Sequence, residues 1–202
     1  SPKRRLVFEE LFVLQTGLLF LKRRRRALAG CTVKKNLLEE FKKTLSFKLT
    51  GAQERVINEC LTDMMSPRPM NRLIQGDVGS GKTAVAAALM YISAGNGFQS
   101  ALMAPTELLA EQHFKTLCKI TENSGIKCAL LTGSLTKKQK DEVKAGLKSG
   151  EIKVAVGTHA LLTDDVEFEN LGLVVTDEQH RFGVGQRSRL SSKGNNPHTL
   201  VM

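Results

Sequence analysis

The sequence predicts an α/β fold in which helices cover both faces of a parallel sheet, preceded by a helical extension at the N-terminus. From residue 47 onward, short β-rich runs alternate with helical stretches, and this alternation is typical of a parallel sheet. A glycine-rich loop follows the first of these runs, and two adjacent acidic residues follow the fifth. Ligands bind beyond the carboxyl ends of strands in such folds, so both features lie where a binding site is expected.

The alternating region is expected to contain six strands and five helices, without internal repeats or low-complexity linkers. Strands are expected at residues 72–75, 101–104, 127–132, 153–156, 171–176 and 199–202. Helices are expected at residues 50–65, 82–94, 107–123, 136–149 and around 185–190.

Two further helices are expected in the N-terminal extension. Leucines recur at three- and four-residue spacing from Leu11 to Leu21, which predicts one helix over residues 3 to about 27. A second helix is expected over residues 35–45, with apolar side chains that include Phe41 on one face.

The positive charge of the chain is concentrated in its first quarter. The net charge is +10, and residues 1–50 hold 13 Lys and Arg against 4 Asp and Glu. Residues 51–202 are nearly balanced, with 17 basic and 16 acidic residues. A basic block of this kind attracts nucleic acid or acidic lipid, whereas the alternative is a solvated helix end. Charge alone leaves both interpretations open, and the densest cluster lies at residues 22–26.

The sequence argues against several other classes of protein. No pair of cysteines has C-x-x-C spacing, so neither a zinc site nor a redox motif is indicated. The uncharged run at residues 11–21 is too short for a bilayer, which needs roughly 20 residues. Glu9 and Glu10 precede this run and argue against a signal peptide. We therefore expect a cytoplasmic protein that is not bound to a membrane.

The strongest motif is the loop Gly76-Asp-Val-Gly-Ser-Gly-Lys-Thr83, which matches G-x-x-x-x-G-K-[ST] between a strand and a helix. Its glycines let backbone N–H groups surround phosphate oxygens, and the next helix directs its positive end at the anion. Lys82 is expected to reach the β- and γ-phosphates, and Thr83 to offer its hydroxyl to Mg²⁺. The cofactors expected are ATP and Mg²⁺, bound by Gly76, Gly79, Ser80, Gly81, Lys82 and Thr83.

A second motif ends the fifth expected strand, where Asp177 and Glu178 follow an apolar run. Asp177 is expected to hold Mg²⁺, often through water, and Glu178 to polarise the attacking water. Acidic residues after a strand are common, so this assignment depends on the glycine-rich loop. With that loop present, Lys82, Asp177 and Glu178 are the expected catalytic residues.

Gln53 has two competing interpretations. Thr50 and Gln53 form a T-x-x-Q capping box, which is a purely structural role. In the functional interpretation, the Gln53 amide hydrogen-bonds the edge of adenine. One glutamine does not easily serve both roles at once, and the spacing alone favours the cap.

Several segments together resemble the RecG branch-migrating DNA helicases of helicase superfamily 2. The resemblance covers nearly the whole chain, and the transcription-repair coupling factor Mfd is the near relative. Mfd proteins tend to carry D-E-E-H where this chain has Gln179. The segments are G-D-V-G-S-G-K-T (76–83), A-P-T-E-L-L-A-E-Q-H (104–113), G-T-H-A-L-L (157–162), D-E-Q-H-R-F-G-V (177–184), F-K-L-T-G-A-Q (47–53) and L-V-F-E-E-L-F-V-L-Q (6–15).

This resemblance implies a division of the chain into two parts. Residues 47–202 look like the first RecA-like motor domain of a P-loop NTPase, ending before the place where the family's S-A-T motif would follow. Residues 1–46 resemble the helical segment that links a fork-binding wedge domain to the motor. The chain begins at Ser1 without Met and ends in an apolar run, so we expect a fragment of a longer protein.

The resemblance also assigns roles to individual residues. It favours adenine recognition by Gln53, and it makes Gln179 and His180 the residues that couple the bound nucleotide to DNA. Thr106 and Thr158 have helix capping as their alternative role. The residues expected to contact DNA are Pro105, Thr106 and Glu107 in one motif, and Gly157, Thr158 and His159 in another.

The expected function follows from these roles. The intact protein is expected to use ATP hydrolysis to move DNA and to remodel branched DNA and stalled forks. Its expected partners are that DNA and, within the same protein, a second RecA-like domain and the wedge domain. Two alternatives remain. One is an Mfd-type translocase that acts on stalled RNA polymerase, and the other is a non-catalytic nucleotide-binding interaction module, with the basic N-terminal helices as its interaction surface.

Overall fold

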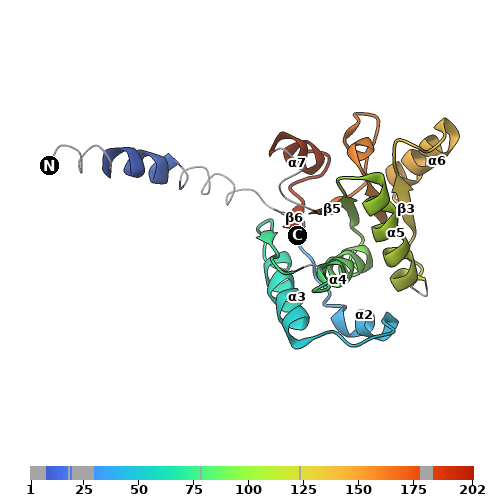
Figure 1. Ribbon diagram of the computed structural model, residues 1–202, viewed down its shortest axis with the longest axis horizontal. Coiled ribbons are helices and arrows are strands. Elements are labelled where there is room, and N and C mark those ends of the chain that lie inside the picture. The colour runs from blue at the N-terminus through green and yellow to red at the C-terminus, as the bar shows by residue number, and fades with distance from the viewer. Residues whose placement is uncertain (1–7, 18, 20–29, 78, 123, 178–183) are drawn as a thin grey trace.

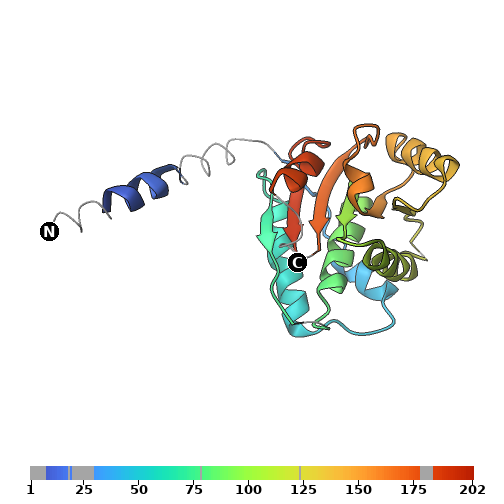
Figure 2. The ribbon, with the colours of Figure 1, turned by 45° about the horizontal axis from the view of Figure 1, so that its top comes forward.

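A six-stranded parallel sheet lies at the centre of the computed structural model (Figures 1 and 2). The structure describes residues 8–17, 19, 30–77, 79–122, 124–177 and 184–202. The strand order of the sheet is β1-β6-β5-β2-β4-β3, and every neighbouring pair of strands is parallel. The carboxyl ends of all six strands therefore lie along one edge. The strands are β1 (Asn71–Leu73), β2 (Gln99–Met103), β3 (Cys128–Leu131), β4 (Val154–Gly157), β5 (Leu171–Thr176) and β6 (His198–Val201).

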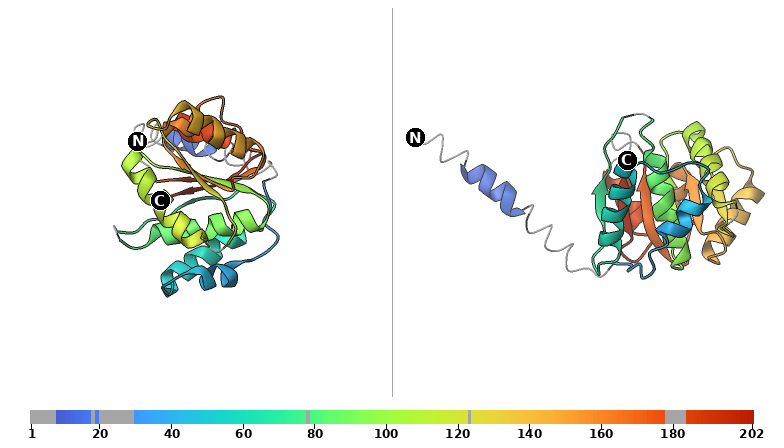
Figure 3. Two further views of the ribbon diagram at one scale, coloured as in Figure 1. Left: turned by 90° about the vertical axis from the view of Figure 1, so that its right-hand side faces the viewer. Right: turned by 90° about the horizontal axis from the view of Figure 1, so that it is seen from below.

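Helices cover both faces of the sheet, which confirms the predicted fold class (Figure 3). On one face, α4 and α5 pack against the strands, and α2 and α3 pack against α4. On the other face lie α6, α7 and the short 3-10 helix η1. The elements are α2 (Leu38–Thr44), α3 (Gly51–Met64), α4 (Lys82–Gly95), α5 (Glu107–Thr121), α6 (Lys137–Lys148), η1 (His159–Leu162) and α7 (Val184–Ser191).

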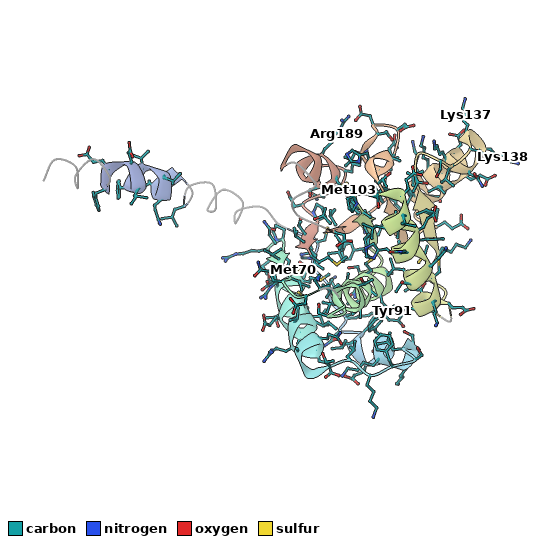
Figure 4. The ribbon with its side chains drawn as sticks, viewed as in Figure 1. Met70, Tyr91, Met103, Lys137, Lys138 and Arg189 are labelled. Carbon is teal, nitrogen blue, oxygen red and sulfur yellow. The ribbon has the colours of Figure 1, made fainter. Side chains whose placement is uncertain are left out.

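The core is divided between the two faces because side chains alternate along each strand. In β2, Leu102 packs with the larger cluster beneath α4 and α5, whereas Ala101 and Met103 pack with the smaller cluster. Figure 4 shows Met103 inside the body of the protein and Tyr91 on α4. The Tyr91 ring packs against Phe41 of α2, with ring centroids 5.4 Å apart.

The six expected strands are all present, and their observed bounds differ from the expected ones by at most two residues at either end. The helix expected at residues 35–45 begins later, at Leu38, because the Asn36 side chain accepts the Leu38 N–H at 3.0 Å. The sequence did not predict η1. Residues 8–17 are helical, while most of the remaining part of the expected first helix lies outside the described residues. None of the helices within the described ranges has the length and apolar composition needed to cross a bilayer.

Residues 30–36, which we call the lead-in segment, are hydrogen-bonded to the body of the fold before α2 begins. The N–H of Val33 donates to the Met64 carbonyl of α3 at 3.0 Å, and the Val33 side chain is buried. Asn96, just after α4, accepts the N–H groups of Lys34 at 2.9 Å and Lys35 at 2.8 Å. Its Nδ2 donates back to the Lys35 carbonyl at 3.0 Å. One amide therefore satisfies three backbone groups of this segment.

His198 makes a second attachment for the lead-in segment. This buried residue begins β6; its Nδ1 accepts the Met70 N–H at 2.9 Å, and its Nε2 bonds to the Cys31 carbonyl. A neutral imidazole protonated at Nε2 satisfies both contacts. Burial lowers the pKa of His198. At Gly30, an added Cβ would lie 2.7 Å from the backbone nitrogen of Pro69, so only glycine allows this close approach.

The His198 contacts predict a loss of stability in mild acid. Protonation would remove the acceptor of the Met70 N–H, and burial holds the folded-state pKa of His198 below its ordinary value of about 6.5. The unfolded state therefore binds more protons as the pH falls through that value, and the stabilisation present above it is lost. Urea unfolding between pH 7.5 and 5 should show a shallower decline for His198→Asn than for wild type. Parallel declines would contradict the assignment, since the other three histidines are present in both proteins.

Candidate active site

The glycine-rich loop connects β1 to α4 and is closed by Lys82. Gly79 and Gly81 have φ angles of 82° and 81°, a left-handed conformation that glycine adopts without strain. Lys82 begins α4, and its Nζ donates to the carbonyls of Gly76 at 2.6 Å and Asp77 at 3.1 Å. The ammonium group therefore lies over the loop, bonded to oxygen atoms of the protein itself.

The N-terminus of α4 faces the same loop. The first N–H groups of a helix lack partners within it, and together they attract anions. Thr83 lies in this first turn with a half-buried side chain, whereas the following residues of α4 are buried in the core. The helix is thus held rigidly behind a loop that presents backbone N–H groups, an ammonium group and a hydroxyl.

Gln53 forms the capping box and also contacts the glycine-rich loop. Its Oε1 accepts the Thr50 N–H at 2.9 Å, and its own N–H donates to Thr50 Oγ1 at 3.3 Å. Its Nε2 donates to the Ser80 carbonyl at 3.1 Å. A Cβ added to Gly81 would lie 2.2 Å from that nitrogen, so Gln53 also packs closely on the loop. The capping interpretation is confirmed, and adenine recognition by Gln53 stays a prediction.

Asp177 follows β5 at the same edge of the sheet. Its N–H donates to the Met103 carbonyl at 3.0 Å, which fixes its backbone to β2. Its Oδ2 lies 2.7 Å from Nε2 of His113 on α5, and the two side chains are only 17% and 11% exposed. The hydroxyl of the preceding Thr176 is buried without a partner among the described residues.

His113 is a site residue that sequence reasoning missed. It ends the A-P-T-E-L-L-A-E-Q-H segment and lies inside α5, 64 residues before Asp177 in the sequence. The contact depends on β2 and β5 being neighbours in the sheet, because α5 follows β2 and Asp177 follows β5, and the sequence carries no signal for that strand order. The expected residues Glu178, Gln179 and His180 lie outside the described residues.

The loop after β2 contains the first expected DNA-contacting motif, which begins at Pro105. Thr106 caps α5, since its Oγ1 accepts the Leu109 N–H at 3.3 Å, so the capping alternative holds for this residue. Glu107 accepts the Ser134 N–H at 3.2 Å from the loop after β3. Hydrogen bonds from Ser134 and the neighbouring backbone, with Lys140 nearby, hold the pKa of Glu107 below its usual range.

The loop after β4 contains the second expected motif. The Thr158 side chain makes no capping bond to η1, so the capping alternative is wrong there. Gly157 is required sterically, because an added Cβ would lie 2.1 Å from the Leu131 carbonyl. His159 begins η1 and is exposed.

The strand order assigns the two groups of expected residues to two halves of one edge. The glycine-rich loop follows β1 and Asp177 follows β5, with β6 between these two strands. The two expected DNA motifs follow β2 and β4, which are neighbours, and β3 completes that half. Lys137 and Lys138 project outward from the start of α6, beyond β3 (Figure 4). Glu107 joins the loops of this half, while His113 joins α5 to Asp177.

Comparison with known proteins agrees with this arrangement. The DEAD/DEAH box helicase family matches residues 50–197. The chain is 50% identical to the ATP-dependent DNA helicase RecG of Synechocystis sp. over 205 residues, covering 99% of this chain and 24% of that protein. It is 48% identical to the RecG protein of Thermotoga maritima over 204 residues, covering 100% of this chain and 26% of that one.

A solved structure of RecG bound to a three-way DNA junction has the same fold. The two superpose with a TM-score of 0.85 at 47% identity, covering 98% of this chain and 27% of the other. The chain thus spans about a quarter of the length of these relatives. The similarity includes the RecA-like sheet and nearly all of the lead-in and N-terminal residues.

Proposed function

We propose a function from one premise: the chain belongs to the DEAD/DEAH box helicase family. Residues 1–202 form the ATP-binding part of a RecG-type DNA helicase, which uses ATP hydrolysis to remodel branched DNA and stalled replication forks. One observation supports this above all: the glycine-rich loop and Asp177 share a sheet edge with the two loops expected to contact DNA. The relatives favour a RecG-type protein over an Mfd-type translocase.

In the nucleotide half, Lys82 exchanges its bonds to the Gly76 and Asp77 carbonyls for bonds to the β- and γ-phosphates of ATP. Thr83 and Asp177 carry the oxygen donors that Mg²⁺ prefers, and we assign the metal to them. Bound Mg²⁺ supplies neutralisation of charge on the phosphate oxygens. Glu178 orients and polarises the attacking water.

Three further residues act around the nucleotide. Gln53 binds adenine through its amide, giving up its bond to Ser80 or to Thr50 when it does so. His180, together with Gln179, relays the state of the nucleotide to the DNA half. Glu178, Gln179 and His180 are assigned from their resemblance to the family motif.

In the DNA half, the loops after β2 and β4 hold the sugar-phosphate backbone. Pro105 to Glu107 and Gly157 to His159 present hydroxyl and N–H groups, which position DNA without reading its bases. Branched DNA is therefore recognised by its shape. The remaining length of the protein supplies the other domains of the helicase. We assign to that length a second RecA-like domain, which supplies arginine fingers, and a wedge domain; the protein acts in the cytoplasm.

The test compares ATP hydrolysis by the full-length protein with hydrolysis by residues 1–202, each with and without a three-way DNA junction. We expect junction-stimulated turnover only in the full-length protein, because arginine fingers contribute about 10³- to 10⁵-fold in related enzymes. Robust junction-stimulated turnover by residues 1–202 would contradict the division of the site between two domains. Displacement of stalled RNA polymerase without junction unwinding would favour the Mfd-type alternative.

A further inference from the structure

The contact between His113 and Asp177 carries an inference that rests on the proposed ATP site. We propose that His113 is a positioning residue, which holds the Asp177 carboxylate in the orientation needed to bind Mg²⁺ together with ATP. His113 does not touch the metal or the nucleotide in this proposal. It acts only through the carboxylate of Asp177.

The geometry of the contact defines its polarity. His113 Nε2 and Asp177 Oδ2 are 2.7 Å apart, which is in the range of a charge-assisted hydrogen bond. An ionised carboxylate only accepts hydrogen bonds, so Nε2 carries the proton and donates it. The contact engages one oxygen of the carboxylate and leaves the other for the metal or for a water molecule bound to it.

Burial makes this contact effective. The side chains of His113 and Asp177 are 11% and 17% exposed, so little water competes for the bond. The terminal torsion of aspartate is otherwise soft and roughly two-fold, which would let the carboxylate rotate. The Asp177 backbone is already fixed by its N–H bond to Met103 at 3.0 Å, so His113 restrains the remaining freedom of the side chain.

The expected effect of His113 on Mg²⁺ binding follows from the known effect of hydrogen bonds to metal ligands. Groups that hydrogen-bond a metal ligand orient it, and their loss typically costs 10- to 100-fold in metal affinity or activity. Here the histidine comes from α5, whose first turn also holds Glu107 against the loop after β3. The same helix therefore touches both halves of the sheet edge.

The experiment measures the affinity of the protein for a fluorescent, non-hydrolysable ATP analogue in Mg²⁺ and in EDTA. Four proteins are compared: wild type, His113→Ala, His113→Gln and Gln112→Ala. Glutamine retains an N–H donor at similar reach, and Gln112 is an exposed neighbour on the same helix. In wild type, Mg²⁺ should raise the affinity for the analogue above its value in EDTA. In His113→Ala we expect this increase to be about 10- to 100-fold smaller, with the affinity in EDTA unchanged. His113→Gln should recover most of the gain, and Gln112→Ala should retain all of it.

Three outcomes would overturn the proposal. His113→Ala could keep the full gain from Mg²⁺, or it could lose affinity equally in Mg²⁺ and EDTA, as expected for a packing defect. His113→Gln could also fail to restore the gain although its melting temperature matches wild type. Failure of the proposed function gives a different result: wild type itself would bind no ATP analogue. That result would contradict both the proposed function and the role of His113.

Discussion

Replacing Lys82 by alanine is expected to weaken ATP binding by about 10- to 100-fold, since a charge-assisted hydrogen bond contributes about 1.5–3 kcal/mol. Hydrolysis in the full-length protein should slow by a further ~10²- to 10³-fold, because the ammonium also stabilises charge that develops on the phosphates. The structure supports this position for the ammonium, whose Nζ lies 2.6 Å from the Gly76 carbonyl and 3.1 Å from that of Asp77. Titration with a labelled ATP analogue measures the loss of binding affinity.

The matched control is Lys43→Ala, which removes the same charge from an exposed position on α2. It should bind ATP as wild type does. Equal affinity in Lys82→Ala and wild type would instead mean that the loop does not bind phosphate. The chain would then fit the alternative of a non-catalytic interaction module.

Replacing Gln99 by alanine is expected to reduce the free energy of unfolding by about 3–5 kcal/mol, since each buried group left unpaired costs about 1–3 kcal/mol. Gln99 begins β2 and is fully buried. Its Nε2 donates to the carbonyls of Leu147 and Ile152, both at 2.8 Å, and its Oε1 accepts the Asn170 N–H at 2.9 Å. One amide thus joins the end of α6 to the segments that lead into β4 and β5.

Urea unfolding measures this loss, with Gln112→Ala as an exposed control of the same chemistry that should change stability by less than about 0.5 kcal/mol. Gln99→Glu separates hydrogen bonding from packing, because it keeps the shape but turns a carboxylate oxygen toward two carbonyls. It should also destabilise the protein strongly. A loss below about 1 kcal/mol for Gln99→Ala would show that water replaces the amide.

Features encoded within a few neighbouring residues were predictable from the sequence. The strands follow from short apolar runs, and the glycine-rich loop follows from the types and spacing of its residues. The capping box at Thr50 and Gln53 is equally local, and both of its hydrogen bonds are present. By contrast, the Gln53 bond to Ser80 spans 27 residues, and no spacing rule indicates it.

Contacts between distant elements were not predictable in the same way. The sequence indicates a parallel sheet but not that β5 lies beside β2, and the bond between His113 and Asp177 depends on that order. The three bonds of Gln99 likewise join segments that meet only in the folded sheet. The expected helix containing Phe41 has an apolar face, but the sequence does not say that this face packs on Tyr91. The division at residue 46 stays a prediction.

The lead-in segment determines how a force applied at the start of residues 30–36 would reach the sheet. Tension applied at residue 30 would be shared by the loop after α3, by α3 itself, by β6 and by the end of α4. The bonds that share it run from Gly30 to Pro67, Cys31 to His198, Val33 to Met64 and Lys34 to Asn96. Independent rotation at this point would need a stretch of backbone without such bonds, and residues 30–34 contain no such stretch. A segment joined directly at residue 30 would therefore be restrained to move with the sheet, because these bonds would have to break before it could rotate independently.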